Sequence, residues 1–214
     1  MPILLHKRPA GLEGRLRRAG LRGAGLTMLL LGSSTLALGA SLTWNGSTSP
    51  NWLTAGNWTP STLPGSGDAV FIDSTGPNTA TIGAAGAAAG TLTVGGAPAG
   101  NGALVINGAG TLAVNGGWTT IGDYGAGTLT ISGGAKLSSA SSRIANNAAS
   151  SGTVTITGAG SQWTTGVLWI SADDGAVGRV RVEAGGKLQS SGNVMIGASS
   201  VNADGRLTVT GAGS

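Results

Sequence analysis

The chain has 214 residues, of which 41 are glycine, and only 9% of its residues are charged. This composition excludes a highly charged disordered tail, and it argues against an ordinary helical enzyme because each glycine in a helix interior costs about 1 kcal/mol. The chain contains no cysteine and its only histidine is His6, which excludes disulfides and thiolate metal sites and, once the N-terminus is removed, histidine-dependent catalysis.

The formal charge of +4 is concentrated at the N-terminus. Residues 1–22 carry six basic side chains against Glu13 alone, whereas beyond residue 40 six basic residues face seven acidic ones. The body of the chain is therefore nearly neutral, and no nucleic-acid partner is predicted.

Residues 1–39 are predicted to be a secretory signal peptide. The basic segment is followed by an apolar run over residues 23–40, which ends in small residues and is too short and interrupted to span a bilayer stably. Gly39 is the expected last residue of the signal, with cleavage before Ala40; cleavage after Ala40 and a single-pass anchor are the alternatives. Export by the Sec or the twin-arginine route stays open.

Residues 40–89 are predicted to form a tryptophan-rich N-terminal cap with irregular first turns. The cap residues are expected to be Trp44, Trp52, Trp58 and Phe71. Because repeat arrays need atypical ends and aromatic side chains bury much area, a structural plug is favoured over a sugar-stacking platform.

Residues 90–214 are an internal repeat in which a glycine precedes alternating aliphatic residues. The unit begins at Gly102, Gly127, Gly152, Gly178 and Gly205, in steps of 25, 25, 26 and 27 residues. Each unit contains three short strands separated by turns, which predicts one triangular coil. Coils stacked about 4.8 Å apart give an all-β fold, a parallel β-helix. The predicted inward ladder comprises Leu129, Ile131, Val154, Ile156, Val180, Val182, Leu207 and Val209.

Several polar and aromatic residues are candidates for a site. Arg179, Arg181 and Arg206 occupy equivalent outward positions, which indicates either a solvated face or a patch for anionic glycans. The carboxylates Asp173 with Asp174, and Asp123 with Asp204, are the candidates for glycan hydrolysis, although acidic residues before glycine are more often turn residues. No catalytic residue, cofactor or metal ligand is predicted, apart from an open question of weak Ca²⁺ binding at the corners. Trp163 and Trp169 are expected in the core, with an exposed ledge as the alternative.

The order of these segments resembles the passenger of bacterial autotransporters. The resemblance is carried by the opening from Trp44 to Phe71 and by units such as Gly127-TLTISGGAKLSS and Gly152-TVTITGAGSQW. It implies a right-handed parallel β-helix displayed at the surface of a Gram-negative bacterium. It also implies a C-terminal translocator barrel, which nothing in this sequence matches, so the chain is expected to be an N-terminal fragment whose repeats continue.

The predicted function is that of an exported, non-enzymatic passenger segment acting in adhesion or self-association. Its expected partners are surface glycans, surface proteins or further copies of itself, with membrane contact only through a barrel outside this sequence. An extracellular β-helix enzyme acting on polysaccharide and a purely structural stalk are the alternatives.

Overall fold

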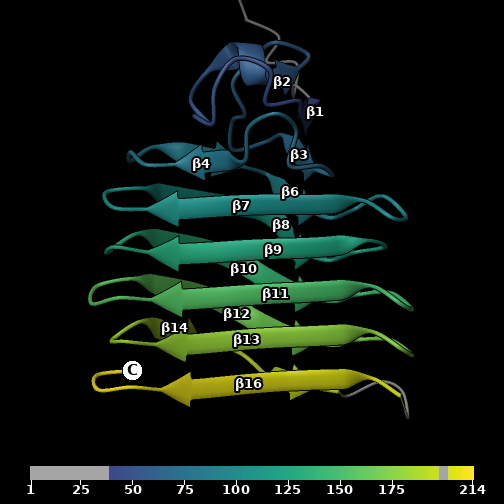
Figure 1. The fold of residues 1–214 in the computed structure, drawn as a ribbon, viewed down its shortest axis with the longest axis vertical. Coiled ribbons are helices and arrows are strands. Elements are labelled where there is room, and N and C mark those ends of the chain that lie inside the picture. Colours follow the sequence, from purple (N-terminus) through teal and green to yellow (C-terminus); the bar gives the residue numbers. More distant parts are fainter. Residues whose placement is uncertain (1–38, 198–201) are drawn as a thin grey trace, which may run out of the picture. The chain divides into compact units, whose positions relative to one another are not determined.

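A computed structural model describes residues 39–197 and 202–214. These residues form a right-handed parallel β-solenoid of about seven turns, which confirms the predicted fold class (Figure 1). The one helix among them is the short 3-10 helix η1 (Ala55–Asn57), and no described helix is long and apolar enough to cross a membrane. The predicted signal peptide lies outside the described residues except for Gly39.

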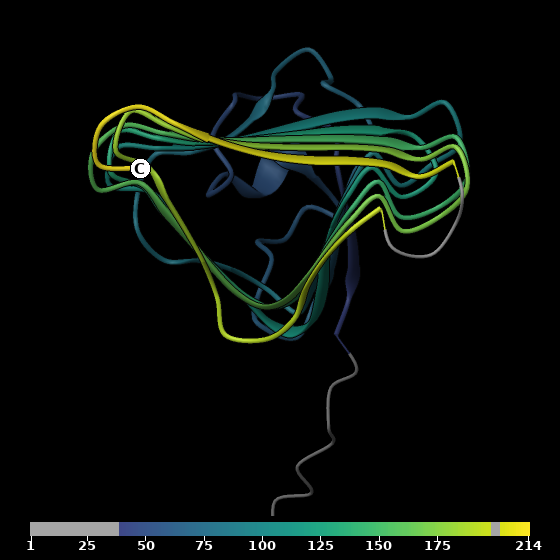
Figure 2. The ribbon, with the colours of Figure 1, turned by 90° about the horizontal axis from the view of Figure 1, so that it is seen from below.

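One side of each coil is formed by a six-stranded parallel sheet, called sheet B here. It is the straight side of the triangular cross-section in Figure 2. Its strands, in spatial order from the C-terminal end, are β16 (Asp204–Thr210), β13 (Val177–Glu183), β11 (Ser151–Thr157), β9 (Ala126–Ser132), β7 (Asn101–Asn107) and β4 (Ala80–Ile82).

The other two sides belong to a ten-stranded sheet, called sheet A, which is parallel except where β1 pairs with β2. Its main path runs through β14 (Lys187–Ser190), β12 (Gln162–Ile170), β10 (Lys136–Ile144), β8 (Thr111–Ile121), β6 (Thr91–Val94), β3 (Ala69–Ile72), β1 (Ser41–Trp44) and β2 (Trp58–Thr59). Beside this path, β15 (Val194–Ile196) pairs with β12, and β5 (Ala87–Ala89) pairs with β8.

Two of the three strands expected in each regular coil are one continuous bent strand. β8, β10 and β12 each turn a corner of the coil within a single strand, at Gly116, Ala140 and Gly166, respectively. The backbone at Gly166 lies so close to the carbonyl of Ala140 that a Cβ on Gly166 would overlap it. Small residues therefore let one strand turn the corner, so the expected break is absent in these three coils, whereas β14 and β15 are separate strands in the last described coil, as predicted.

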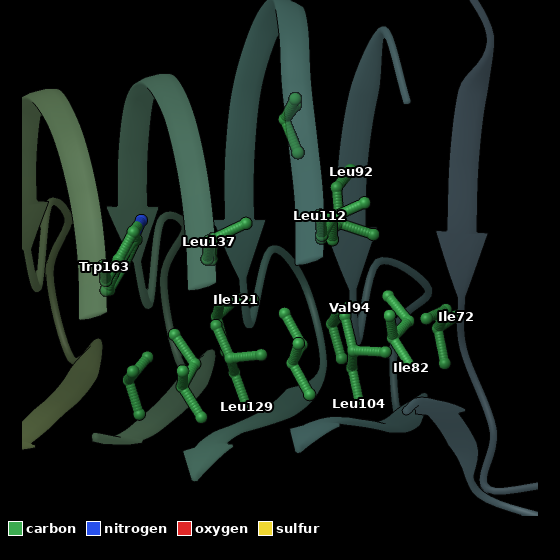
Figure 3. Packing of buried hydrophobic residues seen from close by; sticks show 14 of the residues in the cluster. Ile72, Ile82, Leu92, Val94, Leu104, Leu112, Ile121, Leu129, Leu137 and Trp163 are labelled. Atoms are coloured by element: carbon green, nitrogen blue, oxygen red, sulfur yellow. The ribbon is translucent and has the colours of Figure 1, made fainter. Parts of the chain in front are cut away.

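The interior consists of side-chain columns that run from coil to coil. On sheet B, Leu129, Val154, Val180 and Leu207 pair in register, and a second column joins Ile131, Ile156, Val182 and Val209. On sheet A, Leu112, Leu137 and Trp163 form another column, and Figure 3 shows these side chains in the interior. Period-2 alternation places these residues inward, because successive side chains of a strand point to opposite faces.

Burial along the sheet B columns falls off in the last described coil. Leu129 and Ile131 are fully buried, Leu207 is partly buried, and Val209 is 56% exposed. Val209 therefore does not have the core position predicted for it. The physical reason is that β16 is the last strand of sheet B that the structure describes, so one side of its inward residues has no covering coil.

The glycine that opens each repeat lies where sheet B passes beneath the end of a sheet A strand. A Cβ at Gly102, Gly127 or Gly152 would overlap the carbonyl oxygen of Ile72, Val94 or Ile121, respectively. None of the three has a left-handed φ, so the requirement is for space and not for backbone freedom. The repeated glycine thus fixes how closely successive coils approach.

Candidate binding surfaces

The N-terminal tryptophans form an interior plug. Trp58 is fully buried and packs edge-to-face on Trp44 and Trp52, with ring centroids 5.0 Å and 4.7 Å apart. Its indole Nε1 donates to the carbonyl of Trp52 at 2.8 Å. Phe71 does not join the plug: it is half-buried on the outward side of β3, between Thr43 and Thr93. Buried rings are not available to stack on a sugar, so the cap offers no binding platform.

A buried asparagine organises the loop that holds these rings. The Oδ1 atom of Asn57 accepts hydrogen bonds from the backbone N–H groups of Thr48 and Ser49, both at 2.9 Å. Its Nδ2 donates to Ser49 Oγ at 3.0 Å and to the carbonyl of Asn51 at 2.8 Å. With both ends of the amide satisfied, full burial of this polar side chain is not penalised.

The expected cleavage position lies where the described fold begins. The backbone N–H of Ala40 donates to Asp68 Oδ1 at 2.7 Å, and its carbonyl accepts from the N–H of Ala69 at 2.8 Å. Gly39 lies against the backbone of Gly67, where a Cβ would overlap the Gly67 carbonyl. Both backbone polar groups of Ala40 are thus hydrogen-bonded to the neighbouring coil.

The three predicted arginines do lie together, on the outward face of sheet B. Arg179 pairs in register with Arg206, and Arg181 follows two residues along β13. Together with Thr153, Thr155 and Thr208 they line an open depression of about 400 Å³. This set of residues is called the arginine face below.

Most of the positive charge on the arginine face is neutralised by neighbours. Arg179 forms an ion pair with Asp204 and donates to its carbonyl oxygen at 2.6 Å, while Arg181 approaches Glu183 to 2.5 Å. The hydrogen bond from Arg179 holds the pKa of the Asp204 carboxyl below its ordinary value of 3.8, with smaller help from the charges of Arg179 and Arg206. Of the three guanidinium groups, only that of Arg206 has no ion pair to a described residue.

The structure does not bring the proposed carboxylate pair together. Asp123 precedes β9 and Asp204 is the first residue of β16, so they lie at the same edge of sheet B but three coil steps apart, which corresponds to about 14 Å at the usual strand spacing. Asp123 Oδ1 instead accepts from Asn146 and Asn147 at 2.8 and 2.7 Å, and Asp173 Oδ1 accepts from the backbone of Asp174. No group of three or more acidic, histidine or cysteine side chains suited to a metal occurs among the described residues.

A second outward cluster lies on sheet A and was not predicted. The guanidinium carbon of Arg143 lies 3.7 Å from the ring centroid of Trp118 and 5.1 Å from that of Trp169. The two rings are 5.5 Å apart and tilted by 55°, and all three side chains are half-buried. Trp118, Arg143 and Trp169 are called the Trp–Arg cluster below.

The alternation of inward and outward residues along the strands is the sequence feature that indicates this cluster. Trp118, Arg143 and Trp169 each lie an odd number of positions before the inward isoleucine that ends their strand, so all three face outward. The prediction of a core position is correct for Trp163, which is fully buried, and wrong for Trp169.

These observations define the class of protein: a parallel β-solenoid with a tryptophan cap and two outward surfaces that contain arginine. The family model for a domain of unknown function (DUF8693) matches residues 43–172, which is more than half of the chain. The chain belongs to that family. Neither the curated proteins nor the solved structures contain a significant match to it.

Proposed function

We propose that this chain is an exported, surface-displayed solenoid segment of an autotransporter-like protein, acting in adhesion or self-association and carrying out no catalysis. The observation that supports this proposal is the solenoid itself. Stacked coils with a continuous aliphatic interior make a stiff support, and their outward residues on sheet B are largely threonine and arginine. Such a surface is suited to many weak contacts with another surface.

Two features of the N-terminal region support export. The order of basic, apolar and small residues in the first 40 positions is that of a secretory signal. Among the described residues the first strand begins at Ser41, so removal of residues 1–39 would leave every described strand intact.

Expression of the complete gene in a Gram-negative host tests the proposal in two measurements. Mass spectrometry of the exported protein is expected to give Ala40 as its first residue, and antibody or added protease is expected to reach the solenoid on intact cells. Substitution of Leu30→Asp in the apolar run is the matched control and is expected to block both. Retention of the unprocessed wild-type chain in the cytoplasm would refute the proposal.

The role at the surface is tested with the same cells. Cells that display the wild-type chain are expected to aggregate, or to adhere to a glycan-coated surface, more than cells expressing Leu30→Asp. Surface display with neither effect would favour the stalk alternative, whereas release of reducing sugars from a polysaccharide by the purified chain would favour the enzyme.

A further inference from the structure

The Trp–Arg cluster has a charge that no described residue neutralises. Both ion pairs formed among the described residues lie on the arginine face, and neither involves Arg143. The Nε atom of Arg143 is buried without a hydrogen-bond partner, so it is out of a ligand's reach. A guanidinium group offers five N–H donors, and with no ion pair to a described residue the outer N–H groups of Arg143 remain for an added acceptor.

The two tryptophans fix the orientation of this cation. Contact with the face of Trp118 at 3.7 Å is a close cation–π interaction, and Trp169 approaches from the neighbouring coil. A side chain held in one conformation loses less entropy when a ligand binds, which is the usual benefit of a pre-organised site.

The position of Trp118 depends on a local irregularity of sheet A. Between the paired segments, β8 has residues 115–117 where β10 has Ala140 alone, so the register shifts at this corner. Bulges of this kind often re-aim a side chain near a functional site. After the shift, Trp118 pairs opposite Ser141, two positions before Arg143.

An apolar strip continues from the cluster along the solenoid. Met195 pairs opposite Trp169 on the next coil, and Val167 lies opposite Ser141. The surface therefore combines flat, half-exposed apolar groups with a single unneutralised cation. A ligand that matches both needs an apolar face and a carboxylate in one unit, which is the chemistry of an acidic sugar.

We infer that Trp118, Arg143 and Trp169 form a binding site for a glycan that carries carboxylate groups, a uronic acid polymer being the representative class. Arg143 donates two hydrogen bonds to a carboxylate, and the indole rings contact the apolar faces of the sugar rings. This inference names a ligand class for the proposed adhesion and rests on it only for the cellular setting, because the binding itself is a property of the purified chain.

The test is a calorimetric titration of the full chain with a galacturonic acid tetrasaccharide, compared with the same tetrasaccharide as its methyl ester. Binding is expected for the acid form and at least about tenfold weaker binding for the ester, because a charged bidentate contact is lost. Equal affinity for both forms, or no binding of the acid form, would overturn the inference. Equal binding of hexaglutamate or of acetate at matched carboxylate concentration would also overturn it, since the sugar would then be unnecessary.

Variants assign the binding to the cluster. Arg143→Lys keeps the charge but lacks the planar fork, and Trp169→Phe keeps an aromatic ring of smaller area; about a tenfold and a several-fold loss of affinity are expected, respectively. Lys187→Gln removes one exposed charge from β14, outside both surfaces, and is expected to bind as the wild type does, whereas Arg206→Gln tests the arginine face. Loss of binding in Arg206→Gln with retention in Arg143→Lys would place the ligand on sheet B and refute the inference. Circular dichroism of each variant checks that the fold is kept.

The outcomes for this site and for the proposed function are separable. A chain that binds the acid tetrasaccharide but is never exposed on intact cells refutes surface display and leaves the site in place. Conversely, displayed cells that adhere equally well with Arg143→Lys retain the proposed function and refute this ligand assignment.

Discussion

Replacement of Gly152 by alanine tests the role of the glycine that opens each coil, which is the most regular feature of the repeat. A Cβ at this position would overlap the carbonyl oxygen of Ile121 and would lie 2.7 Å from the backbone nitrogen of Ala145 and 2.8 Å from Cγ2 of Ile144. The Ile121 oxygen would lie only 2.2 Å from this Cβ, whereas an ordinary contact begins at 3.4 Å, so the backbone must move by about 1.2 Å.

The two backbone atoms in this clash are also hydrogen-bonded to each other. The N–H of Ala145 donates to the carbonyl of Ile121 at 2.8 Å, so a shift that relieves the overlap also weakens this bond. Overpacking and loss of one hydrogen bond together destabilise by about 2–4 kcal/mol. In a domain of this size that lowers Tm by roughly 10 °C.

Thermal unfolding followed by circular dichroism measures this effect. Gly67→Ala is the matched control, because a Cβ on Gly67 has its nearest neighbour at 4.0 Å and this glycine has no left-handed φ. The control is expected to melt at or slightly above the wild-type temperature. If Gly152→Ala melted within about 1 °C of Gly67→Ala, close packing would not explain the repeated glycine.

Three further predictions concern the interior, the cap and the ion pair. Thr119 is buried and its hydroxyl has no partner among the described residues, so Thr119→Val is expected to stabilise by about 1 kcal/mol. By contrast, Ser142→Ala breaks contacts to Ser139 and Thr165 at 2.9 and 2.8 Å and is expected to destabilise by about 1 kcal/mol; urea unfolding measures both, and the opposite order would contradict the reasoning. Trp58→Ala empties the centre of the plug and is expected to cost about 3–5 kcal/mol in the same assay, whereas a loss below about 1 kcal/mol would mean that the plug is not needed. The lowered pKa of Asp204 means that its contribution to stability is full above its ordinary value of 3.8 and is lost as the pH falls through the lowered value. Unfolding midpoints of wild type and Asp204→Asn are therefore expected to converge as the solution is acidified, and a constant difference would exclude the ion pair as the cause.

The sheet B columns could be predicted from the sequence because alternation and a fixed step determine them together. Leu129, Val154 and Val180 recur at nearly constant intervals and are flanked by polar residues, so a single register satisfies all coils. Sheet A was harder to predict. Glycine, found at its corners as Gly116 and Gly166, occurs both in turns and at bends within strands, so composition does not separate a broken strand from a continuous one.

The Trp–Arg cluster shows a different limit of the sequence. That Arg143 and Trp169 face outward follows from alternation, but their neighbour Trp118 comes from a coil with a longer corner. Only the three-dimensional register reveals that the two rings converge on one guanidinium group. Likewise, the ion pairs that neutralise the arginine face join β13 to β16 or run within β13, and repeat spacing alone does not indicate which acidic residue each arginine contacts.

The repeated glycine has a consequence for how members of this family can diverge. Between the aliphatic residue that ends a sheet A strand and the next opening glycine lie residues 122–126, 145–151 and 171–177; the first segment is two residues shorter than the other two, yet the pairing of sheet B stays unbroken. Each coil can therefore accommodate an insertion or deletion at this edge without a change in the pairing of the other coils. The loops at this edge, and the contacts that they make with other molecules, can therefore change during evolution while the interior keeps the same pattern.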